Sequence, residues 1–127
     1  MTPADKDLGY VWDMHDAACQ IKEFAQGKLF EDYRQNKMLR LAIERLLEII
    51  GQAAKEVSGE FREQHKKLPW AKIIGLRNVL AHEYGEVKDK KIYLVCTREI
   101  LSDVIHQTLL PVFHPEINRD SVQMLPS

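Results

Sequence analysis

The spacing of apolar residues constrains the fold more than any other feature of this sequence. Apolar side chains recur at intervals of three and four in four long segments, over about residues 4–27, 32–57, 69–84 and 91–110. This spacing is typical of helices, and no segment alternates convincingly with the period of two that a half-buried strand requires. The pattern predicts an all-α fold, an up-and-down bundle of four main helices, with a short charged helix at about 60–66.

Residues that interrupt helices fall between these segments. The predicted boundary residues are Pro3, Gly27, Ser58 with Gly59 as a cap, Pro69, Pro111 and Pro115. Residues 85–91 are polar and predict a connection before the last helix. A chain of 127 residues is long enough to bury one core. We therefore expect one helical domain over 1–115 and a loosely ordered tail over 116–127.

Gly51 interrupts the second segment in the middle of a strong helical pattern. A glycine at such a position costs about 1 kcal/mol relative to alanine. Two interpretations are open: the missing side chain lets another helix approach closely, or the glycine is simply tolerated.

The charge of the chain is nearly balanced overall but uneven along its length. The formal net charge is −1, which argues against a protein that coats nucleic acid by bulk charge. The segment from Arg62 to Lys91 nevertheless carries eight basic and four acidic residues. A local basic site is therefore compatible with the composition.

The two cysteines and the N-terminal segment bear on location. Cys19 and Cys96 lie far apart and have no histidine at zinc-ligand spacing, so we expect two core residues in a reducing compartment and no metal site. The N-terminal segment lacks the pattern of a signal peptide, and no run approaches the ~18 apolar residues of a membrane span. The expected location is the cytoplasm, without membrane attachment.

The third segment carries the residues that point to chemistry. On a helical wheel, Arg77 falls in the middle of the predicted apolar face, whose other members are Trp70, Ile73, Ile74, Leu80 and Ala81. Arginine is almost never fully buried without a partner. Arg77 is therefore expected either to pair with Glu44 or Glu48 on the second helix, or to lie where the apolar face meets a cleft or another chain.

Asn78, His82 and Tyr84 complete this group. Asn78 and His82 are four residues apart and share one stripe of the helix. Arg77 and His82 are five apart, and at 100° per residue they point about 140° away from each other. Two arrangements would bring them together: the helix ends near Ala81 and turns His82 and Tyr84 inward, or two copies of the chain face each other.

Read as a whole, the segment from Arg77 to Tyr84 has the form Arg-x-x-x-x-His-x-Tyr, with Asn78 after the arginine. It resembles the signature of the HEPN superfamily and, more narrowly, the HepT toxins of HEPN–MNT toxin–antitoxin pairs. The flanking blocks YVWDMHDAACQIKEF at 10–24, IIGQAAKEVS at 49–58 and LPWAKIIGLRNVLAHEY at 68–84 resemble that family in the same order. The resemblance covers nearly all of residues 5–110.

The resemblance implies a metal-independent endoribonuclease without a cofactor, acting as a homodimer with paired motifs in one cleft. His82 would serve as general acid and base, Arg77 would stabilise the phosphorane, and Asn78 would contact a phosphate oxygen or orient the imidazole. Tyr84 would be the target of AMP transfer from a cognate nucleotidyltransferase, the antitoxin of a type II pair, in a complex that can be larger than the dimer.

The residues themselves leave other interpretations open for the lysines, for two aromatic side chains and for the chain as a whole. Lys72, Lys88, Lys90 and Lys91 flank the motif and predict an RNA-backbone patch, although a charged solvated loop explains Lys88 to Lys91 equally simply. Trp70 and Tyr93 either stack on bases or pack in the core. The whole chain could also be a non-catalytic helical module that binds nucleotide or RNA and pairs with a nucleotidyltransferase.

Overall fold

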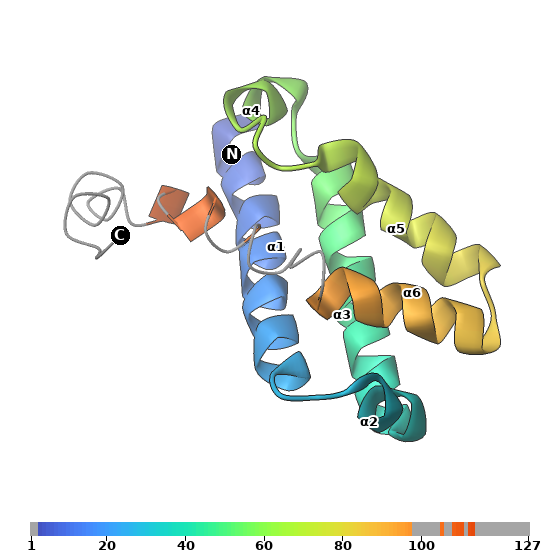
Figure 1. Cartoon of the computed structure of the whole chain (residues 1–127). Helices are drawn as coiled ribbons and strands as arrows, with labels where there is room; N and C mark the ends of the chain where they lie inside the picture. The colour runs from blue at the N-terminus through green and yellow to red at the C-terminus, as the bar shows by residue number, and fades with distance from the viewer. Residues whose placement is uncertain (1–2, 98–104, 106–107, 111, 114–127) are drawn as a thin grey trace.

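The computed structural model describes residues 3–97, 105, 108–110 and 112–113. Every regular element in this part of the chain is a helix, which confirms the all-α class. The helices are α1 (Pro3–Ala25), α2 (Phe30–Gln35), α3 (Lys37–Glu56), α4 (Gly59–Gln64), α5 (Trp70–His82) and α6 (Gly85–Thr97) (Figure 1). The predicted tail over 116–127 lies outside the described residues.

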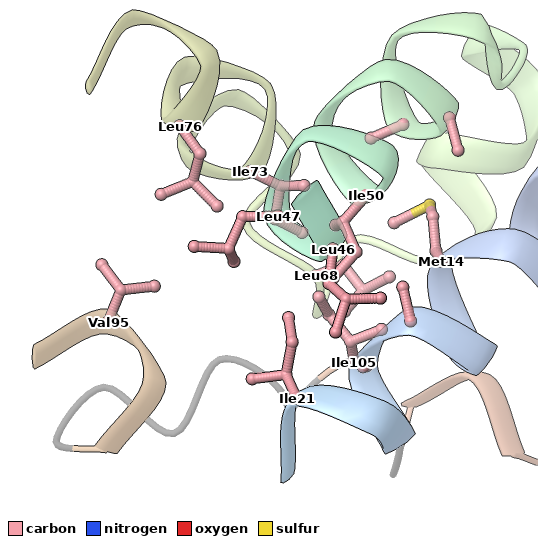
Figure 2. Close-up of a cluster of buried hydrophobic side chains, with 14 of the residues drawn as sticks. Met14, Ile21, Leu46, Leu47, Ile50, Leu68, Ile73, Leu76, Val95 and Ile105 are labelled. Carbon is pink, nitrogen blue, oxygen red and sulfur yellow. The ribbon is translucent and has the colours of Figure 1, made fainter. Parts of the chain in front are cut away.

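Helix α3 is the centre of the bundle. Helices α1 and α5 pack on different sides of it, and α5 and α6 form a hairpin whose turn projects away from α1 (Figure 1). Buried side chains from α1, α3, α5 and α6 meet between these helices, together with Leu68 and Ile105 (Figure 2). The fully buried members include Met14, Ile21, Ile43, Leu47, Ile50, Ile73 and Ile92. Burial of this apolar surface is the main force that holds α5, and hence the motif, against α3.

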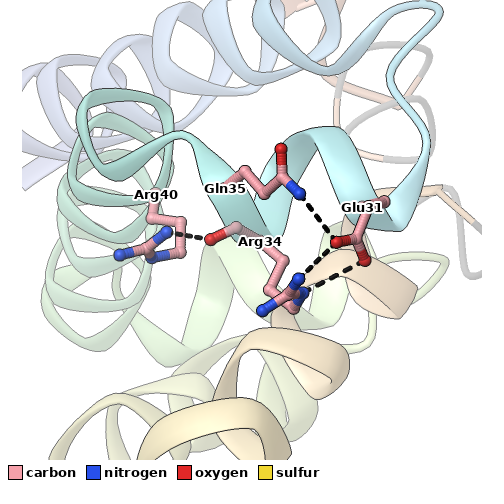
Figure 3. Close-up of polar contacts among 4 residues, drawn as sticks. All are labelled: Glu31, Arg34, Gln35 and Arg40. Carbon is pink, nitrogen blue, oxygen red and sulfur yellow. Dashed lines mark hydrogen bonds and ion pairs between the residues drawn. The ribbon is translucent and has the colours of Figure 1, made fainter.

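The predicted helix over 32–57 is wrong, because the chain forms two helices that meet at Asn36. The Asn36 backbone is extended, and its side-chain oxygen accepts a hydrogen bond from the Leu39 amide at 3.0 Å, which caps α3. Arg40 reaches back to the carbonyl oxygen of Arg34 at the end of α2 (Figure 3). An Arg34–Glu31 pair braces α2 and lowers the pKa of that carboxyl.

The assignment of Gly59 as a cap is also wrong. Gly59 begins α4, and Ser58 is the N-cap, its hydroxyl accepting from the Phe61 amide at 3.2 Å. Asp7 of α1 is buried and accepts two hydrogen bonds from Ser58, from the amide at 2.9 Å and from the hydroxyl at 2.6 Å. The corner between α3 and α4 is thereby fixed to the N-terminal part of α1. The predicted short helix over 60–66 corresponds to α4.

The polar segment 85–91 is helical and does not form a connection. Gly85 has a φ of +59°, which allows the sharp turn after α5, and α6 begins there. Lys88 pairs with Glu44 of α3 at 2.6 Å, and Asp89 lies 3.9 Å from Arg40. These ion pairs join the polar start of α6 to α3. Helical residues at 105, 108–110 and 112–113 follow, so helical structure extends past the predicted end at Leu110.

The core prediction is confirmed for Cys96, which packs partly buried against the hydrophobic core, whereas Cys19 on α1 is only half-buried. Burial raises the pKa of the Cys96 thiol to about 12. His15 of α1 is buried, and its ring lies beside Trp12 and Phe113. In the described part of the chain, no helix combines the length and apolarity needed to cross a membrane.

Candidate active site

The motif helix α5 crosses α3 at Gly51. A Cβ atom on Gly51 would lie 3.0 Å from Cγ of Arg77 and 3.4 Å from the carbonyl oxygen of Ile73. The close-approach interpretation of Gly51 is therefore confirmed. The hydrophobic stem of Arg77 lies against the bare backbone of α3, and this contact limits the directions in which the guanidinium can point.

The buried face of α5 differs from the predicted one. Trp70, Ile73 and Leu76 are its buried residues, so the apolar stripe passes through Leu76 and not through Arg77. Arg77 is exposed. The wheel placed Arg77 on the core face because α5 is apolar on several sides, and sequence alone did not show which side meets α3.

The expected ion pair between Arg77 and the second helix is absent among the described residues. Glu44 pairs with Lys88, and Glu48 pairs with Arg45 at 3.2 Å. Arg77 instead lines an open groove of about 1080 Å³ between α3, α4 and α5, together with Asn78. Of the two positions expected for Arg77, the structure therefore places it at a cleft.

His82 is the last residue of α5, and Tyr84 follows in the two-residue connection to α6. Both side chains are exposed, Tyr84 to 80%. The arrangement in which the helix end turns these two residues inward is therefore wrong. Because α5 is continuous from Arg77 to His82, the two side chains leave opposite sides of the helix. One chain brings Arg77 and Asn78 to the groove but leaves His82 outside its lining.

The four lysines proposed to bind RNA differ in their surroundings. Lys88 pairs with Glu44, and Lys91 pairs with Glu83. Lys72 and Lys90 are exposed. None of the four lines the groove, whose basic residues are Lys55, Arg62, Lys66 and Arg77.

Lys55, Arg62 and Lys66 were not singled out from the sequence. They lie 11 to 22 positions before Arg77, on α3, on α4 and in the turn after α4. These three residues share only their position in the groove. That position can be recognised only when the crossing of α3 and α5 is known. The charge excess from Arg62 onward was a partial signal, since it includes two of the three.

The aromatic candidates for base stacking are engaged in the fold. Trp70 is 9% exposed, and its indole N–H donates to the carbonyl oxygen of His65 at 2.9 Å. Tyr93 is half-buried and donates its hydroxyl proton to the carbonyl oxygen of Lys28 at 2.9 Å. Core packing, the second interpretation of both residues, is what the structure shows. In the described residues, no group of three or more His, Cys, Asp or Glu side chains has an arrangement that could hold a metal ion.

An all-helical bundle that presents Arg-Asn-x-x-x-His-x-Tyr at the exposed end of one helix defines a HEPN-type domain. The family model for "HepT-like: Ribonuclease HepT-like" matches residues 14–111, and the chain belongs to this ribonuclease family.

Individual relatives agree with the family assignment. The protein "Probable ribonuclease HepT" of Thermococcus cleftensis is 32% identical over 93 residues, which is 73% of this chain and 84% of the relative. "Putative RNase TTE0752" of Caldanaerobacter subterraneus subsp. tengcongensis is 44% identical over 78 residues, 61% of this chain and 70% of the relative. "Putative RNase MJ1380" of Methanocaldococcus jannaschii is 37% identical over 75 residues, which is 59% of this chain and 69% of the relative. No solved structure matches the chain.

Proposed function

We propose that this protein is a metal-independent endoribonuclease that cleaves RNA through attack of the 2′-hydroxyl on the adjacent phosphate. The observation that carries the proposal is the exposed Arg77–His82 motif on α5 in a member of a ribonuclease family. Exposure matters because a structural arginine or histidine in this helix would be expected to be buried or paired, and Arg77 is neither within the described residues.

The chemistry follows from what RNA supplies. The 2′-oxygen forms a new bond to phosphorus, the bond to the 5′-oxygen breaks, and the products carry a 2′,3′-cyclic phosphate and a 5′-hydroxyl. His82 would take the 2′-hydroxyl proton or return one to the 5′-oxygen, since imidazole titrates near neutral pH. Arg77 would bind the anionic phosphorane through its planar guanidinium, and Asn78 would donate to a phosphate oxygen or orient the imidazole.

A homodimer would complete this site. Within one chain, Arg77 and His82 point to opposite sides of a continuous helix, so one copy supplies them to different regions of space. In a symmetric pair, Arg77 of one copy can face His82 of the other. Each of the two sites would then hold one histidine, which takes the 2′-hydroxyl proton as base and afterwards protonates the 5′-oxygen as acid.

Regulation by AMP transfer would act at Tyr84. Its hydroxyl would attack the α-phosphate of ATP bound to a cognate nucleotidyltransferase antitoxin and release pyrophosphate. The 80% exposure of Tyr84 leaves the phenol accessible to such an enzyme. The added phosphate would carry negative charge next to the motif and repel RNA. Incubation with that enzyme and ATP should add AMP to the peptide containing Tyr84 and none to Tyr84→Phe.

The test of the nuclease uses the full chain, purified without modification or antitoxin. It should cut single-stranded RNA to fragments ending in 2′,3′-cyclic phosphate, also in excess EDTA. His82→Ala and Arg77→Ala should each lower the rate by about 10²–10⁴-fold while the helical circular dichroism is retained.

Arg34→Ala is the matched control, because it removes an exposed arginine of α2 whose partner, Glu31, is also on α2. Wild-type protein that leaves RNA intact would contradict the proposal. Binding of RNA without products would favour the alternative, a non-catalytic module that pairs with the nucleotidyltransferase.

A further inference from the structure

We propose that the groove between α3, α4 and α5 is an RNA-binding subsite, in which Lys55 and Lys66 contact phosphates of the strand that leads to Arg77. The ligand class rests on the proposed ribonuclease function. The groove is continuous with the proposed site, because Arg77 and Asn78 form part of its lining. A strand lying in it would therefore reach the guanidinium directly.

The charges of the groove favour an anion. Four basic and two acidic residues line it, and both acids are already neutralised: Glu48 pairs with Arg45, and Glu63 pairs with Lys66 at 3.0 Å. Lys55 and Arg77 are exposed, and neither has an ion pair with another residue in the described ranges. The groove thus has an excess of positive charge with room beside it for phosphates.

Arg62 forms a fixed part of the wall. Its Nη2 donates to the carbonyl oxygens of Ala54 and Lys55 at 3.0 and 2.9 Å, and its guanidinium carbon lies 5.9 Å from the centre of the Trp70 ring. These contacts cover the exposed carbonyls at the end of α3, which would otherwise repel a phosphate. No carboxylate of the described residues pairs with Arg62, so its positive charge also remains.

The floor of the groove suits the bases between the phosphates. It consists of short or apolar side chains of α5, namely Ala71, Ile74, Gly75, Leu80 and Ala81. A Cβ atom built on Gly75 meets nothing within 4 Å, so the space above this residue is open. The ion pairs beside the groove also differ from the pair on α6: Lys88 and Glu44 pair with about a fifth of each side chain exposed (22% and 21%), whereas Lys66 and Glu63 are each 74% exposed. An exposed pair contributes little, so Lys66 can turn to a phosphate.

Binding is measured in the His82→Ala background, so that cleavage does not interfere. A labelled single-stranded oligoribonucleotide is titrated into the full chain at several salt concentrations. Lys55→Gln/Lys66→Gln should weaken binding about tenfold or more at low salt and should lower the salt slope by about 0.7 for each lost phosphate contact. Lys6→Gln/Lys37→Gln removes the same charge from exposed sites on α1 and α3 outside the groove and should leave both values nearly unchanged.

A second variant tests the groove by shape. Gly75→Leu places a side chain in the open space without meeting a neighbour at its Cβ, and leucine is a better helix former than glycine. Thermal stability should stay the same or rise, while RNA affinity falls at least several-fold. Gly9→Leu, on an exposed helical site that is equally open, is its control.

Equal affinity and salt slope for the groove variants and their controls would overturn the inference. So would a change of oligomeric state in Gly75→Leu with RNA affinity unchanged in the lysine variant, because the groove would then be covered by a second copy. The two proposals fail separately: binding that depends on the groove lysines without cleavage by wild type refutes the nuclease alone.

Discussion

Asp7 of α1 makes a polar contact with a residue far away in the sequence. Its two oxygens accept from the amide and the hydroxyl of Ser58, 51 positions away, and Asp7 is only 9% exposed. The pair fixes the corner at which α4 leaves α3, and α4 supplies one wall of the groove. Removing the carboxylate would leave the two Ser58 donors without acceptors in a partly buried place.

We therefore expect Asp7→Ala to lower the free energy of unfolding by about 1–3 kcal/mol, measured by urea denaturation. Asp7→Asn keeps one acceptor and should lose less. Asp13→Ala, six positions later on an exposed site of α1, should change stability by at most about 0.5 kcal/mol. If Asp7→Ala is as stable as Asp13→Ala, the contact does not hold the corner.

Cys96 gives a prediction on pH. Burial raises the pKa of its thiol to about 12, so in the folded protein the thiol stays protonated at pH 8. The thiolate is the reactive form, and an unfolded cysteine titrates near pH 8.5. In the Cys19→Ser variant, alkylation at pH 8 should be slow in buffer and at least about 100-fold faster in denaturing urea. Equal rates would show that Cys96 is not buried in solution.

At the level of elements, the crossing of α3 and α5 depends on the missing side chain of Gly51. Gly51→Ala places a methyl group 3.0 Å from the Arg77 side chain and 3.4 Å from a backbone oxygen of α5. Overpacking of this kind costs about 1–3 kcal/mol, and the better helix propensity of alanine offsets about 1 kcal/mol of that cost. We expect a net loss of stability of at most about 2 kcal/mol, and a fall in the rate of RNA cleavage larger than the change in KM.

A double-mutant cycle separates packing from positioning. In the Arg77→Ala background the side-chain clash is gone, so Gly51→Ala should cost less stability there and should reduce the residual cleavage no further. Gly9→Ala, where a Cβ meets nothing within 4 Å, is the control for a helical glycine. Equal costs of Gly51→Ala in both backgrounds would mean that Arg77 is not held by this crossing.

The sequence predicted helices better than it predicted their ends and their inward faces. Periodicity identified the helical segment of α3, because this helix buries one continuous face. It joined α2 to α3, since the helical pattern continues through Asn36 and only the capping hydrogen bond to Leu39 ends it. It missed the start of α6, whose polar residues are held in a helix by Glu44 and Arg40 of α3. Such long-range partners have no local signal.

At the scale of the whole molecule, the motif was recognisable from the sequence but its geometry was not. The spacing of Arg77 and His82 already implied opposite directions, and the structure removes the alternative of an inward-turned helix end. The groove beside Arg77 is lined by residues of α3, α4 and α5, so no single segment of the sequence predicts it. In one chain, Arg77 and His82 point to different sides of α5 and do not face a common point. Experiment therefore has to decide whether a site takes both residues from one chain or one residue from each of two chains.

Mixing two inactive variants answers that question. Suppose that each site of a symmetric dimer combines Arg77 of one copy with His82 of the other. A heterodimer of one Arg77→Ala chain and one His82→Ala chain then has one intact site and one site that lacks both residues. Equal mixing with subunit exchange gives half heterodimers, so RNA cleavage should recover to about a quarter of the wild-type rate. If both residues of a site come from the same chain, each chain of the mixture still lacks one of them and no activity returns. The two variants are unfolded and refolded, once together and once separately, and the rate of RNA cleavage is measured after each. Recovery only after refolding together shows that a site is shared between two chains.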